Sequence, residues 1–160
     1  EENADWQRSL TSDLYGGDSY YRLCQEAVLG IGGVRMLREL GLLSVSTYHM
    51  NEGHASLLGL ELLNEHLVGA GRDYYTGEDL ESVRKHCVFT THTPVSAGHD
   101  RFPLDLAARV LGISAPALAN HDIFCCEGEL NLTYLGLNVS HYVNGVEKKP
   151  AEASRLMFAG

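Results

Sequence analysis

The spacing of apolar residues along the chain predicts helices separated by short strands. Between Tyr20 and Leu40, apolar side chains recur every three or four residues, which places them on one face of a helix. Asp18 and Ser19 are suited to cap its start, because a short side-chain oxygen accepts an unpaired backbone N–H. The same periodicity predicts further helices over Glu52–Val68, Glu78–Lys85, Leu104–Leu111, Ala115–Asn120 and Glu147–Met157.

Short runs of β-branched and apolar residues between these helices predict strands over Leu43–Tyr48, Cys87–Thr91 and Leu132–Val139. Strands that alternate with helices are typical of parallel βαβ units, whose ligands bind at the carboxyl ends of the strands. The sequence therefore predicts an α/β fold in which a parallel sheet is flanked by helices.

The residues capable of chemistry lie at that end of the predicted sheet. His49–His54 follow the first predicted strand, His92–Asp100 follow the second, and Ser140–Asn144 follow the third. Because the carboxyl ends of parallel strands meet at one edge of a sheet, we expect these segments to come together.

Composition narrows the classes of function. The 160 residues predict one domain, and 12 Lys and Arg against 21 Asp and Glu give a net charge of −9. Nucleic-acid binding relies on basic side chains that neutralise phosphates, so this charge argues against such a partner. The apolar runs fall short of the ~20 residues of a membrane-spanning helix, which argues against a membrane role.

The ends and the cysteines indicate a cytoplasmic protein of which this chain is a fragment. The four cysteines are irregularly spaced and the N-terminus is acidic, so we expect reduced thiols and no signal peptide. The chain starts without Met, and its end at Arg155–Gly160 looks equally cut. We therefore expect a piece of a larger protein that exposes apolar surface and self-associates when isolated.

The sequence argues against two functional motifs, the glycine-rich nucleotide-binding loop and the G-x-S-x-G motif of hydrolases. The run Gly30–Arg35 is not a nucleotide-binding loop, because no strand precedes it and Arg35 stands where the third glycine is required. We expect these glycines to allow close packing of the helix instead. No serine lies in a G-x-S-x-G motif, so nucleophilic hydrolysis has no support.

The histidines and carboxylates of the loops leave three interpretations open. Imidazole and carboxylate groups bind zinc or iron, but their spacing here does not place two ligands on one helix face, so we expect no metal. They are also suited to a sugar site, because carbohydrate hydroxyls need many donors and acceptors, and Gly53 and Gly98 allow backbone to approach a ligand. The third interpretation is hydrogen bonding within the loops. The residues concerned are His49, Glu52, His54, His92, His99 and Asp100.

Several motifs, taken in order, resemble those of the α-glucan (glycogen, starch and maltodextrin) phosphorylases of the bacterial and archaeal type. The resemblance covers nearly the whole chain and rests on independent segments. These are Leu14–Asp18, Arg22 with Gln25–Glu26, Leu29–Arg35, His49–His54, Phe89–Val95, Ala97–Pro103 and Leu137–Val146.

The resemblance implies a two-domain glycosyltransferase with facing Rossmann-like halves, in which residues 1–160 form a fragment of the N-terminal, glucan-side domain. It implies transfer of a glucosyl unit from an α-1,4-glucan end to phosphate, giving glucose 1-phosphate with retained configuration. The full-length enzyme would use the phosphate group of pyridoxal phosphate. The lysine that holds this cofactor belongs to the other half, so we expect no cofactor on this chain.

The resemblance also implies roles for single residues. His92 corresponds to a histidine at the glucosyl subsite, and Glu52 to a carboxylate of the same pocket, so both are predicted to be catalytic. Asn51, His54 and His92 are predicted to bind substrate. Ser96 stands where the family usually has proline, and Lys149–Ala151 replaces a segment that usually contains histidine. A non-catalytic fragment or paralogue that at most binds carbohydrate is the alternative function, and a metal hydrolase is the weakest one.

Overall fold

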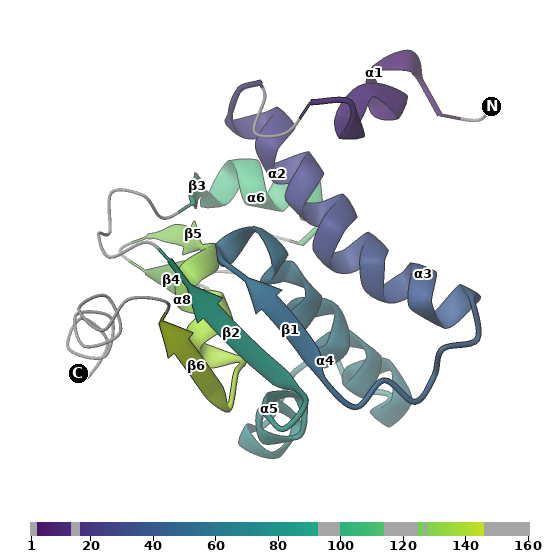
Figure 1. Ribbon diagram of the computed structural model, residues 1–160, viewed down its shortest axis with the longest axis vertical. Coiled ribbons are helices and arrows are strands. Elements are labelled where there is room, and N and C mark those ends of the chain that lie inside the picture. Colours follow the sequence, from purple (N-terminus) through teal and green to yellow (C-terminus); the bar gives the residue numbers. More distant parts are fainter. Residues whose placement is uncertain (1–2, 14–16, 93–99, 114–124, 127, 146–160) are drawn as a thin grey trace.

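The computed structural model describes residues 3–13, 17–92, 100–113, 125–126 and 128–145, and its centre is a parallel sheet (Figure 1). The sheet has three strands in the order β1–β2–β6, namely β1 (Tyr48–Asn51), β2 (Cys87–Thr91) and β6 (Tyr142–Gly145). Met50 pairs with Phe89, which pairs in turn with Val143. The predicted α/β class with a parallel sheet and flanking helices is confirmed.

The long N-terminal helix forms as predicted, in three connected parts: α2 (Ser19–Ala27), the π-helical turn η2 (Val28–Gly32) and α3 (Gly33–Glu39). Asp18 caps it, because its Oδ1 accepts the N–H of Tyr21 at 2.9 Å. The short α1 (Asp5–Arg8) and η1 (Ser9–Thr11) precede it.

Of the clustered glycines, Gly30 is the one that close packing requires. A Cβ atom at Gly30 would lie 2.7 Å from the backbone nitrogen of Leu58, whereas nothing lies within 4 Å of a Cβ at Gly33. Gly30 thus lets η2 approach α4 (Leu57–Ala70) closely. The predicted packing role is confirmed for this glycine alone.

Helices α4, α5 (Gly77–Arg84) and α8 (Leu132–Asn138) lie behind the sheet in the view of Figure 1. Thr76 caps α5, since its hydroxyl accepts the N–H of Asp79. The side chains of Met50 and Phe89 point to this side and are fully buried with Leu57, Leu63 and Leu135. Burial of this apolar layer holds the helices against the strands.

A second, antiparallel sheet was not predicted. Its order is β3–β5–β4, formed by β3 (Arg101–Pro103), β5 (Glu129–Asn131) and β4 (Cys125–Cys126), and α6 (Leu104–Leu111) follows β3. Each strand has three residues or fewer, too short to show a period of two in the sequence. This sheet fixes Asp100, whose carbonyl accepts the N–H of Leu132 at 3.1 Å.

The prediction of a strand over Leu132–Val139 is wrong, because this segment forms α8. Asn131 begins the helix by accepting the N–H of Tyr134 at 3.0 Å, and the buried residues Leu132, Leu135 and Gly136 have helical spacing. A cap and a period of three to four outweigh the strand propensity of the apolar residues. The third strand is β6, which follows α8.

Two other boundaries differ from the predictions. The strand expected over Leu43–Tyr48 begins only at its last residue and runs to Asn51. The helix expected from Glu52 begins at Leu57, because the 3-10 turn η3 (Gly53–Ala55) comes first. The helices expected over 115–120 and 147–157 lie outside the described residues.

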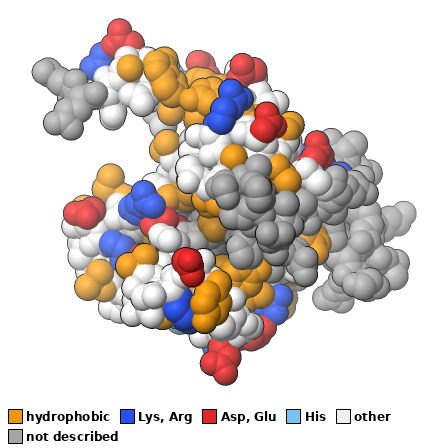
Figure 2. All heavy atoms as spheres, turned by 180° about the vertical axis from the view of Figure 1, so that it is seen from behind, with side chains coloured by type: hydrophobic (Ala, Val, Ile, Leu, Met, Phe, Trp, Pro, Cys, Tyr) orange, Lys and Arg blue, Asp and Glu red, His pale blue; other side chains and the backbone are white. Residues whose placement is uncertain are grey.

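Among the described residues, helices cover one face of the parallel sheet. Exposed His49 and Asn51 alternate along β1 with buried Tyr48 and Met50, and Tyr142 of β6 is 57% exposed. Seen from the opposite side, acidic and basic side chains are dispersed among apolar ones (Figure 2). No helix within the described part of the chain is long and apolar enough to cross a bilayer.

Candidate functional site

Three of the predicted site residues, Asn51, Glu52 and His92, meet where β1 and β2 end. Asn51 is the last residue of β1, and His92 directly follows β2. The imidazole Nε2 of His92 lies 2.8 Å from Oδ1 of Asn51. The predicted gathering of these segments at the carboxyl ends of the strands is therefore observed for β1 and β2.

Glu52 ties the two strand ends together. One carboxylate oxygen accepts the backbone N–H of His92, and the other accepts the hydroxyl of Thr91 at 3.4 Å. Its own N–H donates to the carbonyl of Thr90 at 2.8 Å. The side chain of Glu52 thus fixes the backbone of His92, the residue predicted to lie at the glucosyl subsite.

The backbone of Glu52 is strained. Its φ of 64° lies in the left-handed region, and Glu52 is the one non-glycine residue with positive φ in the described part of the chain. Such a conformation costs on the order of 1–3 kcal/mol and persists where surrounding contacts enforce it. Here those contacts are the bonds to β2, so the strain coincides with the predicted site.

Gly53, the next residue, is buried against protein rather than against an open pocket. A Cβ atom there would lie 3.1 Å from the backbone nitrogen and from Oγ1 of Thr133. The close approach is therefore between η3 and the start of α8, which corrects the expectation that this glycine makes room for a ligand. Gly98 lies outside the described residues.

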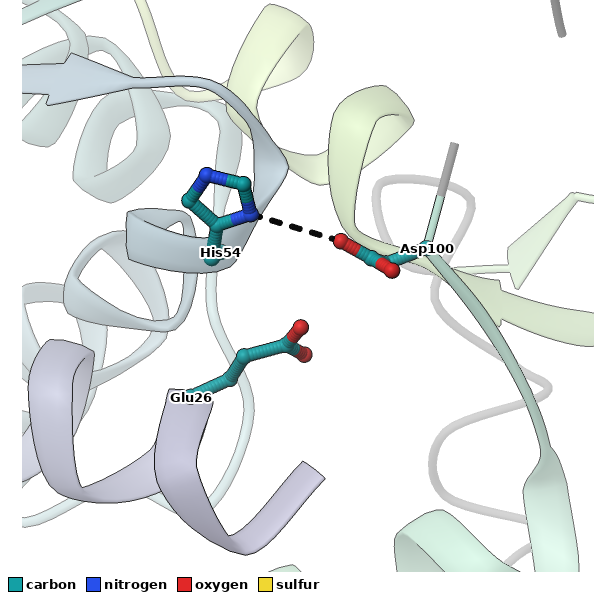
Figure 3. A group of neighbouring side chains, drawn as sticks. All are labelled: Glu26, His54 and Asp100. Carbon is teal, nitrogen blue, oxygen red and sulfur yellow. Dashed lines mark hydrogen bonds and ion pairs between the residues drawn. The ribbon is translucent and has the colours of Figure 1, made fainter. Parts of the chain in front are cut away.

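His54 belongs to a second group of side chains, with Glu26 and Asp100 (Figure 3). Its Nδ1 lies 3.4 Å from Oδ2 of Asp100. The guanidinium of Arg22 donates to the other oxygen of Asp100 and lies 4.0 Å from Oε1 of Glu26. These groups come from η3, the residue before β3, and α2, so they join three separate parts of the chain.

The two carboxyl groups of this second group titrate in opposite directions. Burial, with the nearby charge of Asp100, raises the pKa of Glu26 to about 9. Burial also acts to raise the pKa of Asp100, but the hydrogen bond from His54 and the charge of Arg22 outweigh it and hold that pKa below its ordinary value. At neutral pH, Glu26 is therefore a neutral acid and Asp100 is a carboxylate.

The sequence did not single out Glu26 as a site residue. The signal available was its spacing from Arg22, because residues four apart share a helix face. Its burial, at 5% exposure, depends on tertiary neighbours such as His54 and Asp100, which no local pattern shows.

The second group could also be considered for a metal ion, since one potential ligand atom from each of Glu26, His54 and Asp100 lies within 4.8 Å of the others. A guanidinium already neutralises Asp100, however, so the position of a cation is partly taken by Arg22. The absence of a bound metal therefore remains our expectation. His99 lies outside the described residues.

A pocket of about 360 Å³ adjoins this group. Arg22, Glu26 and His54 line it together with residues of η1 and α2. It is large enough to admit a sugar unit, and it brings together an acid, an imidazole and a guanidinium.

Several known proteins are similar to this chain in sequence. The chain is 39% identical to a glycogen phosphorylase of Mycobacterium tuberculosis over 174 residues, and 34% identical to a maltodextrin phosphorylase of Thermococcus litoralis over 160 residues. A glycogen phosphorylase of Aquifex aeolicus is 32% identical over 169 residues. No protein-family model matches the sequence.

These alignments include 98–99% of this chain but 19–24% of each relative. The chain thus spans about a fifth of the length of the first of these curated relatives. Over nearly its whole length, this chain is similar to an interior segment of the glycogen and maltodextrin phosphorylases, the family that its motifs resemble.

Proposed function

We propose that the chain is part of the N-terminal, glucan-side domain of an α-1,4-glucan phosphorylase. The complete enzyme would transfer a glucosyl unit from the glucan end to phosphate and release glucose 1-phosphate with retained configuration. The names of the relatives support glucan as the substrate class. The observation that carries the proposal is the hydrogen-bonded group of Asn51, Glu52 and His92 at the carboxyl ends of β1 and β2.

Within this site, His92 and Glu52 are the proposed catalytic residues. Cleavage of a glycosidic bond builds positive charge at the anomeric carbon, and preorganised carbonyl dipoles and carboxylates stabilise such charge. The backbone of His92 is held by Glu52, so its carbonyl is fixed before the substrate binds. Asn51, His54 and the imidazole of His92 would bind hydroxyl groups.

Pyridoxal phosphate, which the family uses, does not fit the described residues of this chain. Lys85 is the one lysine among them, and it is exposed at the end of α5. It precedes β2, whereas the proposed site follows that strand. We propose that polypeptide outside these residues binds the cofactor and forms the second, facing half of the glycosyltransferase.

A non-catalytic carbohydrate-binding role is the second candidate function. The chain matches 20% of the length of the Mycobacterium tuberculosis relative, and this small share favours a binding role for the chain in isolation. Binding and catalysis separate experimentally, because binding needs only the strand ends whereas phosphorolysis also needs the phosphate site.

Titration of maltoheptaose into the chain, followed by calorimetry and by NMR of the histidine rings, tests the glucan site. We expect weak binding that shifts His92 and is lost in His92→Ala. His86→Ala is the matched control, because His86 precedes the same strand and its Nδ1 bonds the carbonyl of Ser46 at 2.9 Å. A β-1,4-linked cellodextrin controls for linkage. Equal effects of the two variants would place the glucan elsewhere.

A further inference from the structure

Two neighbouring residues at the end of β1 hold the residue that follows β2, the strand beside it in the sheet (Figure 1). Glu52 accepts the backbone N–H of His92, and Oδ1 of Asn51 lies 2.8 Å from Nε2 of the His92 ring. Successive side chains of a regular strand point to opposite faces, so two neighbours do not normally bond the same partner. The end of β1 therefore departs from regular strand geometry.

The backbone of Glu52 accounts for this departure. Its φ of 64° lies in the left-handed region and interrupts the alternation directly after Asn51. Asn51 keeps the orientation of its strand, on the exposed face that it shares with His49. The strain at Glu52 thus lets both side chains reach His92, one at its backbone and the other at its ring.

The oxygen of Asn51 restricts the state of the His92 ring. An amide oxygen only accepts hydrogen bonds, so Nε2 of His92 must carry the proton of this bond. A neutral imidazole has one N–H, which leaves Nδ1 as an acceptor. The hydroxyl of Thr90, which pairs with Asn51 in the sheet, is bonded instead to Nε2 of His49 at 2.7 Å.

We propose that Asn51 is a positioning residue, which holds the His92 ring with its proton on Nε2 and so presents Nδ1 as a hydrogen-bond acceptor for a glucan hydroxyl. The glucan part of this inference rests on the proposed function, whereas the state of the ring rests on the contacts between the strand ends alone. The role concerns Oδ1 of Asn51, and its Nδ2 group keeps the contact with a hydroxyl proposed above. A side chain locked by a neighbouring hydrogen bond receives the sugar in one defined orientation.

Long-range ¹H–¹⁵N NMR of the histidine-labelled 160-residue chain tests the proposal, with His92→Gln used to assign the signal. At a pH where the ring is neutral, we expect the Nε2–H tautomer for His92. Maltoheptaose should then move the Nδ1 resonance and leave that of Nε2 in place, because only Nδ1 accepts the new hydrogen bond. A predominant Nδ1–H tautomer in the free chain would overturn the proposal, and this measurement needs no variant of Asn51.

Two substitutions of Asn51 separate its acceptor oxygen from its volume. Asn51→Leu removes the oxygen at similar volume, so both tautomers should become populated and the two ¹⁵N resonances of His92 should approach each other. Asn51→Asp puts an acceptor oxygen back and should restore the Nε2–H tautomer. Asn144→Leu is the matched control, because Asn144 pairs with Thr90 from the other side and should not affect the tautomer. Equal effects of Asn51→Leu and Asn144→Leu would overturn the positioning role.

The response to maltoheptaose separates the possible failures. An Nδ1 resonance that does not move, in a chain with the expected tautomer, would contradict the glucan contact but not the role of Asn51. Movement of the Nε2 resonance instead would overturn the positioning role, since the glucan would then have displaced Asn51 from the ring.

Discussion

Glu26 is the described side chain whose protonation couples folding most directly to pH. Its ordinary pKa of 4.5 rises to about 9 on burial, so the folded chain keeps a proton that the unfolded chain releases. The stability from this residue is fully present below pH 4.5 and is lost as the pH rises toward 9. The slope is at most about 1.4 kcal/mol per pH unit.

Glu26→Gln should remove this dependence. We expect the variant to gain stability relative to wild type as the pH is raised from 5 to 8, measured by urea unfolding at each pH. Glu65→Gln is a control, because Glu65 is paired with Arg38 near the surface. A constant difference between Glu26→Gln and wild type across this range would show that Glu26 is ionised in the folded chain.

The substitution Glu52→Gln tests the charge of this side chain at the proposed site, because it removes the charge and nearly keeps the shape. In the complete enzyme, Glu52→Gln should lower kcat more than it raises KM, because a carboxylate aimed at developing positive charge acts in the transition state. Steady-state phosphorolysis of maltodextrin measures both constants. A rise in KM with unchanged kcat would reduce Glu52 to a binding group.

At the scale of single residues, part of the site could be predicted from the sequence. Asn51, Glu52 and His92 could be placed together because each stands at a predicted strand end, and the strand ends of β1 and β2 do meet. The contact between His54 and Asp100 also joins two segments that were predicted to meet. Arg22 and Glu26 could not be placed with them, because both come from α2, which precedes the sheet in the sequence. Only the tertiary fold brings them into contact.

At the scale of elements, two glycines test how closely η2 packs on α4. Gly30→Ala should destabilise the chain by about 1–3 kcal/mol, because the new methyl group meets the backbone of Leu58. Gly33→Ala, with open space around it, should be neutral or stabilising by about 0.5–1 kcal/mol. Thermal unfolding followed by circular dichroism compares them. Equal losses for both would contradict the close approach of these helices.

Elements with caps were predicted best from the sequence. Asp18 marks the start of α2 because its side chain makes a local bond to the backbone, and Thr76 does the same for α5. The segment that became α8 was predicted wrongly because its apolar residues suit a buried helix and a buried strand equally. The feature that decides between them is the cap at Asn131, whose side chain accepts the N–H of Tyr134.

The whole molecule has apolar surface without a covering layer among the described residues. Parallel sheets normally have both faces covered, yet His49 and Tyr142 are exposed here. Met36 and Leu40, one turn apart on the helix surface at α3, are 59% and 67% exposed. Such surface favours association.

We therefore predict that the isolated chain self-associates, and that Met36→Lys with Leu40→Lys weakens the association. Tyr74→Lys is the control, since Tyr74 is 59% exposed and lies on neither α3 nor α4 but in the segment before α5. Light scattering as a function of concentration measures the effect. A monomeric wild-type chain with one sharp thermal transition would contradict the prediction.

Phosphorolysis tests most directly whether the ends of β1 and β2 form the glucosyl site of a phosphorylase. The measurement is release of glucose 1-phosphate from maltodextrin and phosphate by a polypeptide that joins these 160 residues to their flanking segments. We predict that His92→Ala lowers kcat by ~10²-fold, near the lower end for loss of one transition-state contact, because its backbone carbonyl remains. His86→Ala should keep the wild-type rate, and the 160-residue chain alone should release none. A wild-type rate for His92→Ala, or no glucose 1-phosphate from the joined polypeptide, would contradict the assignment.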